Sequence, residues 1–241
     1  MCSSDLGWQH RISFDTGFLD ATEVHEVSGV EFRRLRPTHH FAYLLLHIFR
    51  HLLGSSVRLL SLYEVATFVR SRDSEAQLWT EIKQILDQDK RLASACALVL
   101  GLVDLTFPTV LPDSLRDVCE RSLSEESALW IQRCSASWLY AEPPGNKLPL
   151  LVQQQFWQDR RAWRRYLVRR LLPIRRPHPL SDEATEWTKR SFAYRREEIG
   201  YQTSRAWYHL RSGCEYLFAR WRWMAFRRVD ARSAHRTAEW F

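Results

Sequence analysis

The sequence contains little glycine and no long apolar run. Eight glycines in 241 residues, without a regular ladder of alternating strands, argue against a β-sandwich or a β-barrel. The longest apolar runs, near residues 41–46 and 97–105, are far short of the roughly 20 residues that span a bilayer. No basic segment followed by an apolar stretch opens the chain. We therefore expect a cytoplasmic protein, or at most one that is peripheral on a membrane.

Paired cysteines are also missing. The five cysteines are odd in number and lack the close spacing of zinc ribbons and redox motifs. We predict that they are reduced thiols. They are Cys2, Cys96, Cys119, Cys134 and Cys214.

The chain shows no catalytic triad and no glycine-rich phosphate loop. Gly54-Ser55 and Asp87-x-Asp89 have the composition of a metal-dependent nucleotidyl-transfer site, in which two carboxylates on one strand hold Mg²⁺. Here Asp87 and Asp89 end a helical pattern, where side chains two positions apart diverge by about 200°. We interpret them as a solvated helix end, and we predict no metal site in this chain.

The residues that are present favour a helical protein with a real core. An apolar content of 45% over this length is enough to fold one or two domains. We predict a mainly α fold, a multi-helix bundle or array with a small N-terminal β remnant of two or three short strands. The expected divisions are edge strands in 1–35, a helical bundle in 36–140, a linker in 141–150 and a basic Trp/Arg-rich region in 151–241.

Charge is distributed unevenly along the chain. Residues 1–150 contain 15 Lys and Arg against 19 Asp and Glu, a balance of −4, whereas residues 151–241 contain 20 against 9, a balance of +11. Such asymmetry indicates an anionic partner for the last third: nucleic acid, an acidic lipid surface or an acidic protein.

The spacing of apolar residues along the sequence predicts where most helices and strands lie. Trp8–Phe14 is strand-like, and two extended runs around Ser28-Gly29 predict a hairpin. Apolar residues at helical spacing then predict helices over 37–53, 57–70, 74–86, 91–105, 113–123 and 124–140. We expect Ser74 to begin a capping box with Gln77, and Asp113 and Ser124 to cap their helices.

The helix predicted over 37–53 is apolar around most of its circumference, so we expect it to be central. Its narrow polar strip contains three histidines, of which His47 and His51 are four apart and could share a metal ion. The alternative is that they form hydrogen bonds inside the bundle, to carboxylates such as Glu64 or to carbonyl groups. The strip consists of His40, Tyr43, His47, Arg50 and His51.

An amphipathic helix is predicted over 151–172, followed by helices from about Ser181 and over about 201–235. The arginines of the helix over 151–172 are interleaved with Phe156, Trp157, Trp163 and Tyr166. These arginines could contact phosphates while the aromatic rings stack on bases or lie at a membrane interface. They could equally be a solvated face. The candidate anion-binding residues are Arg160, Arg161, Arg164, Arg165, Arg169 and Arg170.

A family resemblance rests on the run Leu44–Val69 and on Asp5-Leu6-Gly7-Trp8. The run resembles the uncharacterised nucleotidyltransferase family of the polymerase-β-like superfamily, with Glu64 where that family usually has Asp. The N-terminal tetrapeptide resembles the family's Asp-Leu-His-Trp strand, with Gly7 in place of His. The matching residues of the run are His47, His51, Arg58, Leu59, Leu62 and Ala66.

The resemblance implies that the chain is the C-terminal helical part of a nucleotidyltransferase-like protein and begins at the trailing edge of the catalytic sheet. The intact protein would use Mg²⁺ and an NTP to transfer a nucleotidyl group to an unknown acceptor. This chain lacks the Gly-Ser and Asp-x-Asp motifs in their required context, so alone it would be inactive and hold no cofactor. The expected cleft-lining residues are Asp5, His47, His51, Arg58 and Glu64.

A second hypothesis needs no enzyme. The basic last third would make the protein a helical module that holds an anionic partner, with binding that weakens as salt is raised. The two hypotheses are compatible because they concern different parts of the chain.

Overall fold

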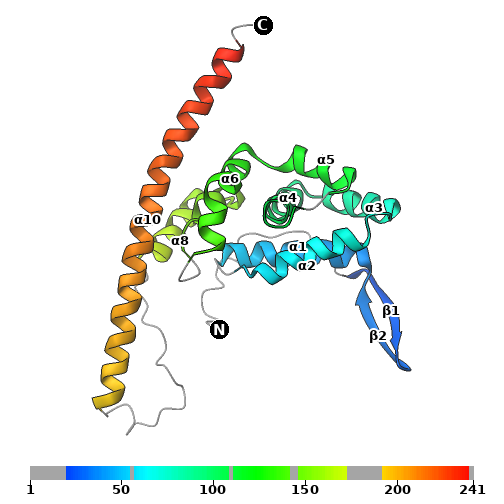
Figure 1. Ribbon diagram of the computed structural model, residues 1–241, viewed down its shortest axis with the longest axis horizontal. Coiled ribbons are helices and arrows are strands. Elements are labelled where there is room, and N and C mark those ends of the chain that lie inside the picture. Colours follow the sequence, from blue (N-terminus) through cyan, green and yellow to red (C-terminus); the bar gives the residue numbers. More distant parts are fainter. Residues whose placement is uncertain (1–19, 55–56, 109–110, 142–145, 173–191, 239–241) are drawn as a thin grey trace. The chain divides into compact units, whose positions relative to one another are not determined.

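The computed structural model describes residues 20–54, 57–108, 111–141, 146–172 and 192–238 (Figure 1). It confirms the predicted fold class, because the chain is mainly α-helical with a small antiparallel sheet near the N-terminus. The chain divides into two compact units, residues 1–158 and residues 159–241.

A two-stranded hairpin opens the described chain. Strands β1 (Thr22–Val27) and β2 (Val30–Leu35) pair antiparallel, with Val27 opposite Val30. Ser28 and Gly29 join them with φ values of 54° and 81°. Two positive φ values in a two-residue loop are typical of a type I′ turn, whose twist matches that of the strands. The predicted hairpin is confirmed, whereas the strand-like segment 8–14 lies outside the described residues.

Six helices follow within the first unit, and their bounds agree closely with the periodicity. Pro37 occupies the first turn of α1, where its missing N–H costs nothing. The helices are α1 (Pro37–Leu53), α2 (Leu59–Ser71), α3 (Ala76–Asp87), α4 (Lys90–Thr106), α5 (Asp113–Ser122) and α6 (Glu125–Leu139).

Helix α4 is the centre of this unit. It packs against α1, α2, α3, α5 and α6, and Figure 1 shows it nearly end-on among them. A Cβ atom at Gly101 would lie 2.6 Å from Cδ1 of Ile131, so glycine there lets α6 approach α4 closely. Helix α1, which we expected to be central, buries one face and leaves its polar strip at the surface, with Tyr43 and Arg50 exposed.

The helix caps agree only in part with the sequence signals. The side chain of Ser124 accepts a hydrogen bond from the N–H of Ser127, as predicted. The predicted capping box at Ser74 is wrong, because α3 follows Glu75 without a side-chain cap. Asp113 is likewise not a cap but the first residue of α5, after Pro112. Its carboxylate lies in the first turn, where a negative charge favours the helix dipole.

Residues 146–157 differ from the expected linker and continuous helix. Asn146, Lys147 and Leu148 are buried, and the indole N–H of Trp130 donates to the carbonyl of Leu148 at 2.9 Å. The chain then forms the short helix α7 (Leu150–Gln153) and the 3₁₀ turn η3 (Gln154–Phe156). The predicted helix over 151–172 is therefore interrupted before residue 160.

The second unit contains α8 (Arg160–Leu171) and the 47-residue helix α10 (Phe192–Ala238). Asp159 caps α8, since its carboxylate accepts a hydrogen bond from the N–H of Arg161 at 2.7 Å. The helix predicted from about Ser181 begins outside the described residues. Of the helices that the structure describes, none combines the length and the apolar character that a membrane span requires.

Candidate functional site

The polar strip of α1 brings two of the predicted site residues into contact. The Nε2 atoms of His47 and His51 lie 3.0 Å apart, and the two rings meet edge-on with centroids separated by 4.5 Å. One imidazole therefore donates a hydrogen bond to the other, which is the pairing that spacing of four on a helix allows. Each of the two rings thus has the other histidine as a partner.

Charge around this pair is positive. Burial, the His47 ring and the guanidinium groups of Arg50 and Arg58 lower the pKa of His51 below its ordinary value of 6.5. At neutral pH the ring is uncharged and can accept or donate a hydrogen bond.

The other predicted cleft residues do not join the pair. Arg58 precedes α2 and is near enough to His51 to influence its charge. Glu64 lies two turns further along α2 and is exposed. Asp5 lies outside the described residues, as does Cys2. Among the residues that the structure describes, no three His, Cys, Asp or Glu side chains are placed to hold a metal ion.

Asp87 and Asp89 have structural partners. Oδ1 of Asp89 accepts hydrogen bonds from the N–H groups of Arg91 and Leu92 at 2.7 and 3.4 Å, so it caps α4. Asp87 accepts from Arg121 of α5 at 3.2 and 3.4 Å. The two carboxylates thus serve different helices, and the interpretation as a solvated helix end is wrong because both have partners.

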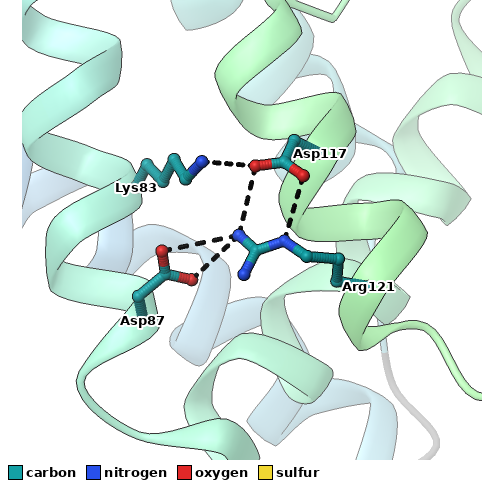
Figure 2. Close-up of polar contacts among 4 residues, drawn as sticks. All are labelled: Lys83, Asp87, Asp117 and Arg121. Atoms are coloured by element: carbon teal, nitrogen blue, oxygen red, sulfur yellow. Dashed lines mark hydrogen bonds and ion pairs between the residues drawn. The ribbon is translucent and has the colours of Figure 1, made fainter.

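Four charged residues connect α3 to α5 (Figure 2). Asp117 accepts hydrogen bonds from Lys83 and from Arg121, and Arg121 in turn reaches Asp87. The bonds from Lys83 and Arg121 lower the pKa of the Asp117 carboxyl. Each charge in this network has a partner within it, so we assign it to holding two helices together and not to binding.

Four cysteines lie in the part of the chain that the structure describes, and no disulfide joins them: Cys96, Cys119, Cys134 and Cys214. Burial raises the pKa of Cys119 to about 12 and raises that of Cys96 as well. A thiol with a raised pKa is a poor nucleophile, so neither cysteine is a candidate catalytic residue. Cys96 belongs to the core, and Cys119 is half-buried.

The arginines of α8 form the most distinctive surface of the chain. At about 100° per residue, five of the six occupy one contiguous half of the helix, while Ala162, Trp163 and Leu167 are buried on the other half. We call this half the α8 arginine face. Its arginines, all exposed, are Arg160, Arg161, Arg164, Arg165 and Arg169.

Arg170, the sixth candidate, does not belong to this face. It lies on the covered half of α8, is only partly exposed, and acts electrostatically on Tyr208 of α10. By contrast, within the described part of the chain none of the five arginines of the face forms an ion pair through its side chain.

The aromatic residues expected between the arginines are absent from the surface. Phe156, Trp157 and Trp163 are buried, and Tyr166 is half-buried on the covered side. They cannot serve as a stacking platform for bases. The interruption before α8 separates Phe156 and Trp157 from the helix that carries the arginines, whereas Trp163 and Tyr166 lie on the covered half of that helix.

Sequence reasoning missed two apolar members of the same face. Val168 and Leu172 are 53% and 65% exposed and share the angular range of the arginines. Their spacing from Arg161 and Arg165, seven residues in each case, is the signal that could have identified them.

Comparisons with known proteins found no match to this chain among family models, curated proteins or solved structures.

Proposed function

We propose that the protein binds an anionic lipid surface peripherally through the α8 arginine face. The observation that carries this proposal is the half-helix of five exposed arginines, which form no ion pair with another residue that the structure describes and are backed by a buried apolar half. The buried half fixes the helix in the fold, so binding does not have to order its backbone.

The composition of the face favours lipid over nucleic acid. Val168 and Leu172 lie among the arginines and are exposed. At a bilayer, such side chains enter the headgroup region while guanidinium groups remain at the phosphates. Against a nucleic acid they would have no apolar partner, and the buried aromatic rings could not stack on bases.

The expected affinity is moderate. A basic residue close to an anionic membrane contributes about 1 kcal/mol, so five arginines contribute on the order of 5 kcal/mol at physiological salt. Partial burial of Val168 and Leu172 adds to this. Reversible binding in which the protein exchanges between membrane and solution is the expected behaviour.

The test is co-sedimentation with vesicles that contain about 30 mol% phosphatidylserine. Replacing Arg161, Arg164, Arg165 and Arg169 by glutamine should weaken binding about 100-fold or more, because about 1 kcal/mol is lost per arginine. A matched control replaces four exposed arginines of the first unit. They are Arg33, Arg36, Arg50 and Arg91.

The control variant should bind nearly as tightly as the original protein. Equal weakening by both sets would show that only net charge matters and would contradict the proposal. Stronger binding to duplex DNA or RNA than to the vesicles, lost with the α8 arginines, would assign the face to nucleic acid instead.

The nucleotidyl-transfer hypothesis stays a prediction. The contact between His47 and His51, with Arg58 nearby, is compatible with a polar surface beside a cleft, but these residues supply no carboxylate pair for Mg²⁺.

A further inference from the structure

Helix α10 is unusually long. Its 47 residues extend for about 70 Å at 1.5 Å per residue, and Figure 1 shows it as one uninterrupted helix. A helical pattern much longer than 25 residues is typical of coiled coils, membrane spans and helical repeats. A membrane span is not found among the described helices.

One side of α10 is buried in a regular repeat. Ser212, Tyr216 and Trp223 are buried, and Ala219 and Phe226 are partly covered. These positions are spaced by four, three, four and three residues, the pattern of a helix that packs along its length.

The opposite side repeats the same spacing but is exposed. Six positions follow one another at intervals of three, four, three, four and three residues, and two of them, Trp207 and Trp221, are 66% and 63% exposed. This series is displaced by two residues, about 200°, from the buried one. We call it the α10 seam; its members are Trp207, Leu210, Cys214, Leu217, Trp221 and Met224.

We propose that the α10 seam pairs with the α10 seam of a second copy of this chain. A narrow apolar stripe with alternating spacings of three and four is the type that fits another helix, whereas a helix lying on a membrane needs a broader apolar face. The inference concerns association in solution and does not depend on the proposed lipid binding.

The charges beside the seam permit this pairing. With Trp207, Cys214 and Trp221 at the a positions of a heptad, the flanking e and g positions include only two arginines in this stretch, Arg211 and Arg220. The other four flanking residues are uncharged: Ala206, Gly213, Phe218 and Ala225.

When two seams pair, neither Arg211 nor Arg220 faces an arginine at these flanking positions of the second copy. In a parallel pair, Arg211 faces Ala206 of the second copy and Arg220 faces Ala225, because g positions contact the following e positions. In an antiparallel pair centred on the seam they face Phe218 and Gly213. Between Ala206 and Ala225, neither direction therefore places two arginines opposite each other.

The area is sufficient for a weak dimer. A tryptophan side chain buries roughly 150–250 Å², so covering the exposed parts of two tryptophans and four smaller side chains on each copy buries on the order of 1,000 Å² in total. That value is at the lower limit for a specific interface. We therefore expect a dimer that forms in the micromolar range.

The test is the mass of the full chain in reducing buffer, measured by sedimentation velocity from about 1 to 100 μM. The original protein should rise from 28.7 kDa towards twice that mass. A variant carrying both Leu210→Glu and Leu217→Glu should stay monomeric at every concentration. Both leucines are exposed, so circular dichroism should show unchanged helix content.

Leu60→Glu is the matched control, since Leu60 of α2 is 63% exposed, close to the 61% of Leu210. It should dimerise like the original protein. A monomer throughout the range would overturn the proposal, as would a dimer that survives both seam substitutions. A monomer that binds vesicles through Leu210 and Leu217 would assign the seam to lipid and would equally overturn it.

Discussion

Gln153 shows how one side chain can complete the end of a distant helix. It is fully buried, and its amide nitrogen lies 3.0 Å from the carbonyl oxygen of Leu53 and 3.4 Å from that of Leu52. The last carbonyls of a helix have no partner within it. Gln153 in α7 therefore donates hydrogen bonds to the last two carbonyl groups of α1.

Replacing Gln153 by leucine should destabilise the protein. The substitution nearly keeps the side-chain volume but removes a donor to the carbonyl of Leu53, and the loss of one such hydrogen bond costs about 1 kcal/mol. Urea denaturation measures the free energy of unfolding. Gln154→Leu, at the exposed neighbouring position, should change it little. Equal stability of the Gln153 variant and the original protein would show that the carbonyls of α1 do not depend on this amide.

At the residue scale the sequence could not identify this contact. Gln153 lies 100 positions from Leu53, and a glutamine in a predicted helix has no pattern that marks it as buried. The contact between His47 and His51 was easier to predict from the sequence, because spacing of four on a helix brings two side chains together. The periodicity alone did not indicate that the two rings would be hydrogen-bonded to each other.

Among the elements, periodicity was a reliable guide. The apolar spacing of α1 to α6 predicted each helix to within a few residues, because each buries one face against the others. Irregular segments were not predicted: the interruption between η3 and α8 depends on the cap formed by Asp159 and on the burial of Phe156 and Trp157. Both are tertiary effects that override helix propensity.

The network between α3 and α5 should contribute to stability in a pH-dependent way. Because its partners lower the pKa of Asp117 below the ordinary 3.8, the network's contribution is fully present above pH 3.8 and is lost as the pH falls through the folded-state pKa. Asp117→Asn should therefore lower the melting temperature at neutral pH, and the difference should shrink in acid and at high salt.

Asp113→Asn is the control for that substitution. Asp113 is 99% exposed, and its carboxylate lies 3.6 Å from Arg116, a surface pair of the kind that contributes little. Thermal melts followed by circular dichroism should show almost no change for this variant. A loss at Asp117 that is the same at all pH values would assign its effect to packing and not to charge.

For the whole molecule, the uneven distribution of charge is the feature that the sequence showed most directly. The balance of +11 in residues 151–241 predicted a basic surface, and the structure locates part of it on one half of α8. Counting charges could not show that Arg170 lies on the covered side or that the neighbouring aromatic rings are buried, since both depend on the rotation of α8 in the fold.

The salt dependence of vesicle binding tests the central claim most directly, namely that the α8 arginine face holds an anionic surface. Binding of the full chain to phosphatidylserine vesicles should fall steeply as salt is raised, and the variant with four glutamines on α8 should show weak binding with a shallow dependence. Equal slopes for the two proteins would contradict the account, because the charges that hold the surface would then lie outside α8.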